Sequence, residues 1–370
     1  MDRLPVAAPD LRGNEERYVV DAIRSSWISS TGPYVDRFER EFAAFSGARA
    51  AVSVANGTVA LHLALLALAA GPGDEVIVPS LTYVATANAV RYVGAEPVFV
   101  DVDPATWCID PAAVENALTP RTKGIIAVHL YGHPADMDAI NRLATKHGLW
   151  VVEDAAEAHG AQYRGRRAGS LGTIGTFSFY GNKIVTSGEG GAVTVDDPEL
   201  ERRIRLFRGQ GMDPQRRYFF PVIGYNYRLT NVACALLCAQ LERWMELAGR
   251  RAAVFEAYER ALSQVAGIGF QPRADWAEPA RWLFCITVDE AGFGMSRDEL
   301  AGRLDADNIE TRPFFHPLHR LPPYEHRIGS NRPLPVTDHL ALAGLNLPTS
   351  SLMTDEDVAR VVTAIKNARR

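Results

Sequence analysis

The chain has 370 residues, of which 47% are hydrophobic and 22% are charged, and its formal net charge is −5. These values are typical of a globular protein with about two domains. The negative charge and the lack of a dense Lys/Arg stripe argue against nucleic acid as a partner. The sequence has no run of about 18 apolar residues and no apolar leader, so we expect a soluble cytoplasmic protein without a membrane anchor.

Four cysteines occur at irregular positions, which are Cys108, Cys234, Cys238 and Cys285. Cys234 and Cys238 are four residues apart on a predicted helix and therefore share one face of it. A zinc site would need further ligands near this pair, and no histidine pair is close in the sequence. We therefore expect no metal and interpret the cysteines as small apolar core residues in a reducing compartment.

Strand and helix patterns alternate along the first part of the chain. Runs rich in Val and Ile predict strands at residues 75–80, 97–102, 124–130 and 149–152. Apolar residues at helical spacing predict helices at residues 56–69, 83–92, 111–118 and 136–147. Buried strands that alternate with amphipathic helices are typical of a mainly parallel sheet covered on both faces. The pattern therefore predicts an α/β fold.

The pattern changes near Leu229. A long helical stretch without strong breakers is predicted at residues 230–261, and it could form the spine between two domains. Further elements are predicted in chain order as a strand at 282–288, a helix at 296–305, a strand at 309–315 and a helix at 354–368. Thr354 is a plausible N-cap of the last helix, with Asp357 three residues later. We predict a large domain at residues 1–240 and a smaller α/β domain at 241–370.

Asp154 follows the predicted strand at 149–152 directly, in the string EDAAEAHG. Ligands of open α/β sheets bind at the carboxyl ends of the strands, so an acid at this position faces a site rather than the core. The carboxylate could meet a cationic ring nitrogen. Taken alone, the residue is more simply interpreted as an aspartate that caps a helix or stabilises a turn.

Lys183 lies in the string TFSFYGNKIVTSGEGG, between a strand-like run and a glycine-rich turn. Lysines avoid such apolar surroundings unless they are paired or functional. Desolvation lowers the pKa of a lysine, and a neutral amine is what Schiff-base chemistry requires. A single lysine near glycines is usually a surface residue. Its separation of 29 residues from Asp154, across one further strand, favours a shared site.

The string Asn56-Gly57-Thr58 precedes the predicted helix at 56–69. The N-terminus of a helix attracts phosphate, and Ser178 is a second phosphate candidate. A plain N-cap is the simpler interpretation of this string. Tyr83 follows the strand at 75–80, where its ring could stack on a flat ligand or pack in the core. A lysine, an acid, a phosphate cup and a stacking ring are the parts that a pyridoxal phosphate (PLP) site needs.

Several strings together resemble one known family. They are NGTVALHLAL, GPGDEVIVPSLTYVATANAV, VVEDAAEAHGA, GTFSFYGNKIVTSGEGG and GYNYRLTN. They are similar to the DegT/DnrJ/EryC1/StrS sugar aminotransferases, which are PLP enzymes of fold type I, the aspartate aminotransferase fold. The resemblance extends from about residue 5 to the end of the chain. It implies a homodimer with active sites at the subunit interface.

The resemblance also implies a role for each cofactor residue. Lys183 would form the Schiff base with PLP, Asp154 would form a salt bridge with its ring nitrogen, and Tyr83 would stack on the ring. The phosphate would be held by Gly57, Thr58 and Ser178. Many members of the family have Gln where this chain has Glu157, near the phenolic oxygen of the cofactor. A protonated Glu157 could donate a hydrogen bond there, whereas an ionised one would repel the oxygen.

Other positions would serve the substrates. Asn226 would reach the phosphate of the partner subunit, and Arg228 would bind the carboxylate of the amino donor, L-glutamate, a task suited to a planar bidentate cation. His316 would lie near the sugar, and Trp27 and Ser29 would border its pocket. Without the resemblance, these side chains would be interpreted as packed residues or solvated loop residues. The basic loop at 208–217 could contact a nucleotide diphosphate or could be a solvated charge cluster.

The strings SWISSTGPYV, RGQGMDPQRRYFFP and RPFFHPLHRLPPY resemble the members that aminate GDP-4-keto-6-deoxy-D-mannose. The alternative within the family is a TDP- or UDP-linked 4-keto sugar. A sugar dehydratase of this fold would have histidine in place of Lys183. A non-catalytic PLP-fold regulator is a further alternative, disfavoured by the intact set of site residues. A Rossmann dehydrogenase is disfavoured because no G-x-G-x-x-G opens the first helix.

Overall fold

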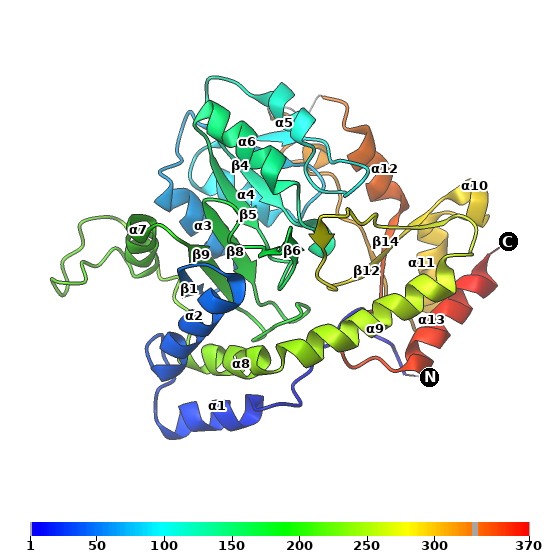
Figure 1. Cartoon of the computed structure of the whole chain (residues 1–370), viewed down its shortest axis with the longest axis horizontal. Helices are drawn as coiled ribbons and strands as arrows, with labels where there is room; N and C mark the ends of the chain where they lie inside the picture. The colour runs from blue at the N-terminus through cyan, green and yellow to red at the C-terminus, as the bar shows by residue number, and fades with distance from the viewer. Residues whose placement is uncertain (1, 328–331, 370) are drawn as a thin grey trace.

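A seven-stranded sheet forms the centre of the computed structural model, which describes residues 2–327 and 332–369 (Figure 1). In spatial order its strands are β1 (Ala50–Val54), β9 (Gly191–Val195), β8 (Ile174–Ser178), β5 (Trp150–Asp154), β4 (Thr122–Val128), β2 (Glu75–Pro79) and β3 (Glu96–Val100). Strands β8, β5, β4, β2 and β3 run parallel, β9 runs in the opposite direction beside β8, and β1 at the edge pairs antiparallel with β9 and so runs in the same direction as the other five. The predicted mainly parallel sheet is confirmed.

Helices cover both faces of this sheet, because its strands are apolar on both sides. The apolar core on one face includes side chains of α3 (Gly57–Ala67), α4 (Ala85–Tyr92) and α7 (Pro198–Arg208). The core on the other face includes side chains of α1 (Glu15–Arg24), α2 (Pro33–Ser46), α5 (Pro111–Ala117), α6 (Met137–His147) and α8 (Asn231–Glu242). All four cysteines are buried.

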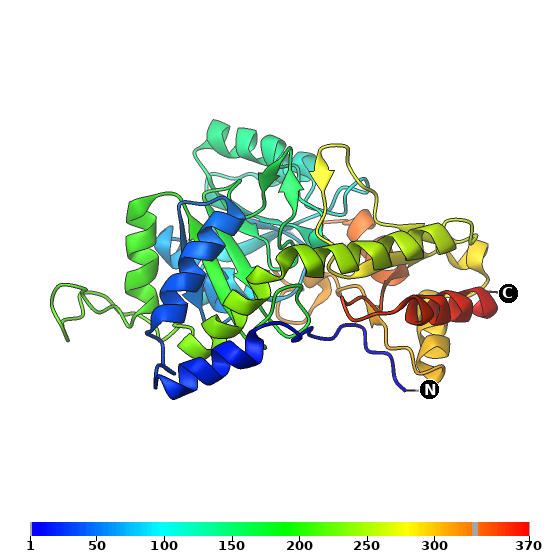
Figure 2. The ribbon, with the colours of Figure 1, turned by 60° about the horizontal axis from the view of Figure 1, so that its bottom comes forward.

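The predicted long helix at 230–261 is wrong in one respect, because it is two helices. Helix α8 ends at Glu242, and α9 (Trp244–Leu262) begins after Arg243, which has φ −100° and ψ 9°. The guanidinium of Arg243 contacts Asp10 and Glu246 at the break. The sequence carries neither glycine nor proline there, so its local pattern indicates continuous helix. Figure 2 shows α9 leading from the large sheet to the second part of the chain.

A second, antiparallel sheet lies beyond α9. Its strands in spatial order are β10 (Ile268–Phe270), β12 (Phe284–Val288), β14 (Gly344–Leu347) and β13 (Arg312–Pro313). The remaining helices of this part are α10 (Glu290–Phe293), α11 (Arg297–Ala306), α12 (Pro335–Ala343) and α13 (Asp355–Ala368). Thr354 and Asp357 form the expected capping box of α13. The strand predicted at 309–315 is reduced to the two residues of β13.

Shorter elements connect the two parts. A small sheet joins β11 (Ala277–Glu278) to β6 (Gln162–Tyr163) and β7 (Arg166–Arg167). Two single-turn helices are η1 (Leu130–Gly132) and η2 (Leu318–Arg320). His319 in η2 is buried, and its Nδ1 lies 2.7 Å from Ser80 Oγ after β2. This position gives His319 a role in packing rather than in a ligand site.

The N-terminal segment crosses to the second part, as both ribbon views show (Figures 1 and 2). Leu4 pairs with Ile309, and Thr349 donates a backbone hydrogen bond to Val6 at 2.8 Å. In the other direction, Leu318 and Leu334 pack into the core of the large sheet. The domain boundary near residue 240 stays a prediction, with contacts crossing it from both sides. Across the described residues, no helix is long and apolar enough to cross a membrane.

Candidate active site

A cavity of about 950 Å³ opens where the parallel strands β8, β5, β4 and β2 end. This is the edge at which ligands of such sheets bind. The end residues of three strands, Ser178, Asp154 and Val128, line it together with the segment after β2. All the cofactor residues predicted within one chain line the cavity, namely Gly57, Thr58, Tyr83, Asp154, Glu157, Ser178 and Lys183.

Asp154 is the last residue of β5 and is buried. Its Oδ2 accepts a hydrogen bond from Thr86 Oγ1 at 2.8 Å, and its Oδ1 accepts one from the Ala156 N–H at 3.3 Å. Burial raises the pKa of Asp154, while these two hydrogen bonds and the charge of Lys183 act against the rise. The described residues form no ion pair with this carboxylate, so it is suited to a cationic group on a ligand.

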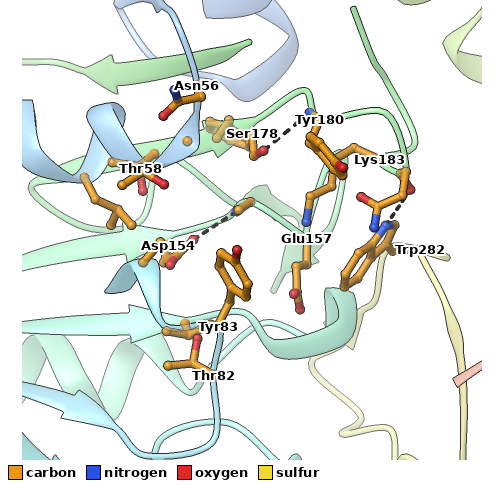
Figure 3. A pocket seen from close by; sticks show the side chains of 18 of the residues that line it. Asn56, Thr58, Thr82, Tyr83, Asp154, Glu157, Ser178, Tyr180, Lys183 and Trp282 are labelled. Atoms are coloured by element: carbon orange, nitrogen blue, oxygen red, sulfur yellow. Dashed lines mark hydrogen bonds between the residues drawn. The ribbon is translucent and has the colours of Figure 1, made fainter. Parts of the chain in front are cut away.

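Lys183 lies in the turn after β8, where its N–H donates to the carbonyl of Tyr180 at 2.9 Å. Figure 3 shows the side chain reaching into the cavity toward Glu157. Burial lowers the pKa of Lys183; the carboxylates of Glu157 and Asp154 oppose this shift, and Arg312 adds to it. A lysine amine with a lowered pKa is a better nucleophile and base at neutral pH.

Glu157 lies close to this lysine in the same cavity. Its Oε2 accepts a hydrogen bond from the Tyr131 N–H at 2.7 Å. Tyr131, in η1, has a positive φ of 53°, a left-handed conformation that is uncommon for a residue with a side chain. Burial raises the pKa of Glu157 to about 7, and Lys183 opposes the rise. A carboxyl group in this state exchanges a proton near neutral pH.

A phosphate cup is formed where α3 meets the end of β8. Asn56 caps α3, accepting a hydrogen bond from the Val59 N–H at 3.0 Å. A Cβ at Gly57 would lie 2.8 Å from Ser178 Cβ, so glycine allows the helix start to approach the strand. The hydroxyl residues Thr58 and Ser178 lie beside this helix N-terminus (Figure 3). Free N–H groups and two hydroxyls are the donors that a phosphate needs.

Tyr83 lies in the link between β2 and α4. The helix predicted at 83–92 begins at Ala85, two residues later, so Tyr83 is not part of it. Its side chain is 58% exposed, so it is not a core residue. Its ring centroid is 5.8 Å from that of Phe315. Figure 3 shows the ring beside Asp154 and Glu157, where it can cover one face of a flat ligand.

Some predicted residues lie outside the cavity, namely Trp27, Ser29, Asn226, Arg228 and His316. Trp27 and Ser29 precede α2, and their carbonyl oxygens accept hydrogen bonds from Asn231 at 2.7 and 2.5 Å. Both side chains are exposed. His316 is exposed beside Phe315, which does line the cavity.

Asn226 and Arg228 lie in the segment between α7 and α8. The guanidinium Nη2 of Arg228 donates to Asn226 Oδ1 at 3.1 Å, and Asn226 is exposed. The same segment begins with the basic loop at 208–217. Arg208 is not available to a ligand there, because its Nη1 is 2.7 Å from Glu39 Oε1.

Sequence reasoning missed the part of the cavity wall that the second sheet supplies. Trp282 precedes β12, Arg312 belongs to β13, and Asn346 belongs to β14. The Nζ of Lys183 is 3.9 Å from the centre of the Trp282 ring. These residues are about 100 or more positions from Lys183 in the sequence. The apolar run that predicts a strand at 282–288 is the nearest signal, and it does not indicate a site.

Comparison with known proteins agrees with this geometry. The sequence pattern of the DegT/DnrJ/EryC1/StrS aminotransferase family matches residues 9–366 of this chain. The chain belongs to this family. Its members are PLP-dependent, and the solved PLP form of the protein Spr1654 from Streptococcus pneumoniae is similar to this chain. That likeness has a TM-score of 0.92 at 28% identity, over 99% of this chain and 98% of the other. The predicted fold type and PLP as cofactor are therefore confirmed, and the protein is a PLP-dependent aminotransferase.

Two curated family members are similar along most of their length. GDP-perosamine synthase from Caulobacter vibrioides is 49% identical over 366 residues, covering 99% of this chain and 98% of that protein. The dTDP-3-amino-3,4,6-trideoxy-alpha-D-glucose transaminase from Streptomyces venezuelae is 42% identical over 337 residues. That match covers 90% of this chain and 87% of the other protein.

Proposed function

We propose that this protein is a GDP-perosamine synthase. It transfers the amino group of L-glutamate to the C4 ketone of GDP-4-keto-6-deoxy-D-mannose and forms GDP-perosamine and 2-oxoglutarate. The donor carbon is oxidised from amine to ketone, and C4 of the sugar is reduced from ketone to amine, so nitrogen and electrons balance. The observation that carries the proposal is the 49% identity to such a synthase along nearly the whole of both chains.

The cavity residues fit PLP on two observations of their own. The buried Asp154 has a raised pKa and forms no ion pair in the described residues, and Ser178 lies so close to Gly57 that a Cβ at position 57 has no room. Bound there, PLP supplies an electron sink and carries the amino group between the two substrates. We assign Asp154 to its ring nitrogen, Tyr83 to its ring face, Glu157 to its phenolic oxygen, and the phosphate to Gly57, Thr58 and Ser178.

Lys183 has two tasks in this proposal. Its amine would hold the cofactor covalently at rest, and once free its Nζ would take the proton from Cα of the amino acid. Both tasks need a neutral amine at some stage, and burial of Lys183 lowers its pKa in that direction. Asp154 stabilises the protonated ring nitrogen, because an anion beside a cation favours the charged form of each.

The donor carboxylate needs a cation. Arg228 is our first assignment, acting in the cavity of a partner subunit, because its side chain does not line the cavity of its own chain. Arg312 is a second candidate within the chain, since it lines the cavity from β13. Planar guanidinium groups bind carboxylates in a bidentate manner. His316, Trp27 and Ser29 are assigned to the sugar side of the same site.

The proposed assembly is a homodimer with sites at the interface. The segment between α7 and α8 extends away from the body of the chain at the left of Figure 1. It carries exposed apolar side chains, including Tyr218 at 71% and Ile223 at 89% exposure. Large apolar groups on a projecting loop favour a protein partner. Asn226 and Arg228 follow on the same segment, and we assign Asn226 to the phosphate of the partner's cofactor.

A product assay tests the substrate. Purified protein with PLP and glutamate is incubated with GDP-4-keto-6-deoxymannose in one reaction and with a TDP-linked 4-keto-6-deoxyglucose in another. We expect an aminated sugar mass with the GDP substrate only. Amination of the TDP sugar alone would replace the proposal by the alternative of an aminotransferase for a TDP-linked 4-keto sugar. A colourless protein that aminates neither sugar would favour a non-catalytic regulator.

A further inference from the structure

The side chain of Trp282 contacts Lys183, although Trp282 belongs to the part of the chain that carries the second sheet. Its ring centre is 3.9 Å from Lys183 Nζ, and the residue is 3% exposed. Trp282 precedes β12 of the second sheet, whereas Lys183 follows β8 of the large sheet. Figure 3 shows the indole beside the lysine at the cavity wall. An ammonium this close to an indole face is attracted by the negative face of the ring.

Contacts of both its ring and its backbone hold Trp282 in this orientation. Its Nε1–H donates to the carbonyl oxygen of Asn182 at 2.8 Å, one residue before Lys183. The backbone carbonyl oxygen of Trp282 accepts a hydrogen bond from Nη1 of the buried Arg251 at 2.7 Å. The Tyr131 ring lies nearly parallel to it, with an interplanar angle of 20° and centroids 6.3 Å apart. The ring therefore presents one defined face to the amine.

The charged groups around Lys183 do not provide such a surface. Glu157 and Asp154 attract its ammonium, but in the proposed reaction they act on the phenolic oxygen and the ring nitrogen of the cofactor. Arg312 repels it, and His159 is a buried ring whose pKa burial lowers to about 3, so it is neutral at pH 7. The indole face attracts an ammonium without adding a titrating group to the cavity.

We propose that the indole face of Trp282 is the resting place of the Lys183 amine whenever that amine is not bonded to the cofactor. Trp282 is a positioning residue that acts through Lys183, and this inference rests on the role of Lys183 in the proposed function. The ring keeps the free amine inside the cavity and stabilises its protonated form against desolvation. Trp282 precedes the second sheet, so the packing of the two parts of the chain sets the position of the indole. Through the indole, this packing influences the proton affinity of the Lys183 amine.

The test measures the proton affinity of Lys183 in the full-length protein without cofactor. Lys183 is labelled with a small amine-reactive reagent over a range of pH, and peptide mass spectrometry gives the midpoint of its reactivity. Trp282→Phe and Trp282→Leu both lose the hydrogen bond to Asn182, and Phe keeps an aromatic face, whereas Leu is apolar without one. We expect the midpoint to decrease from wild type to Phe to Leu, by about 0.5 to 1 pH unit in total, which is roughly three- to tenfold in the dissociation constant.

The matched control is Trp276→Phe, since Trp276 is half-buried against Tyr163 and does not line the cavity. Its midpoint should equal that of wild type. Equal midpoints for Trp282→Phe and Trp282→Leu would overturn the inference, because the ring would then have no effect on the amine. If Trp282→Leu does not fold, tetrafluorotryptophan inserted at position 282 keeps the shape and removes the negative face. A midpoint below wild type supports the inference, and an unchanged one overturns it.

Failure of the inference and failure of the proposed function can be told apart. Cofactor binding is measured separately, by the visible absorbance that appears when PLP is added to each variant. A shifted midpoint in a protein that binds no PLP would uphold the contact between Trp282 and Lys183 while refuting the proposed function. An unshifted midpoint in a protein that binds PLP would refute the effect of Trp282 on Lys183 and leave the proposed function standing.

Discussion

The cavity wall and the segment between α7 and α8 both carry predicted site residues, but their surroundings are opposite. In the wall, Asp154, Glu157 and Lys183 are enclosed, and burial shifts the pKa of each. On the segment, Asn226 is exposed and pairs with Arg228, which does not line the cavity of its own chain. This difference supports our proposal that one chain contains the acid–base groups, whereas phosphate and carboxylate recognition is completed by a second chain.

Replacing the lysine of the wall should have the largest effect. Lys183→Ala removes the covalent partner of PLP and the proton carrier, so turnover should fall by about a thousandfold or more. The visible absorbance of the PLP-bound protein should also disappear. Lys146→Ala is the control, because Lys146 is exposed and pairs only with the exposed Glu115 in the described structure. Undiminished turnover of Lys183→Ala would refute the mechanism.

Replacing Asp154, the acid at the end of β5, should cause the second-largest loss of activity. Asp154→Asn keeps the shape and removes the charge beside the ring nitrogen, and we expect a loss of about a hundredfold or more in kcat. Thr86→Val removes the 2.8 Å hydrogen bond that orients Asp154, with an expected loss of about tenfold. Steady-state kinetics with glutamate would measure both. A loss for Thr86→Val that exceeds the loss for Asp154→Asn would contradict this order.

Co-expression tests whether the projecting segment serves a second chain. A chain with Asn226→Ala and Arg228→Ala and a chain with Lys183→Ala should each be nearly inactive. Together they form heterodimers with one intact site, so about a quarter of wild-type activity should return on random pairing. If the segment served its own chain, no activity would return. Size-exclusion chromatography would verify that the mixed protein is dimeric.

The smallest effect concerns Glu157 and is a pH dependence of stability. Burial raises its pKa from the ordinary 4.5 to about 7, so between these values the folded chain binds more protons than the unfolded chain. The stability that Glu157 contributes is complete below pH 4.5 and is lost as the pH rises through about 7. Glu157→Gln should therefore show a smaller fall in unfolding free energy across this window, measured with urea and without cofactor. Parallel curves would contradict it, and Glu115→Gln is the exposed control.

The elements from β2 to β5 agree with the sequence pattern to within about three residues, because each is set by local apolar periodicity. The proximity of Asp154 and Lys183 was predictable for the same reason. Parallel neighbouring strands end at one edge, and β5 and β8 are neighbours. The break at Arg243 was not predictable, because it depends on contacts with Asp10 rather than on a local breaker.

The sequence alone therefore determined the α/β class, the cofactor and the residues that belong to one sheet edge, since all of these follow from local patterns and family strings. The tertiary structure decided what surrounds Lys183. Trp282, Arg312 and Asn346 reach the cavity because the second sheet packs across its opening, and no local pattern encodes a contact over about 100 residues or more. It also decided that Asn226 and Arg228 lie outside their own chain's cavity although Tyr227 between them lines it, because neighbouring side chains of an extended segment point to opposite sides.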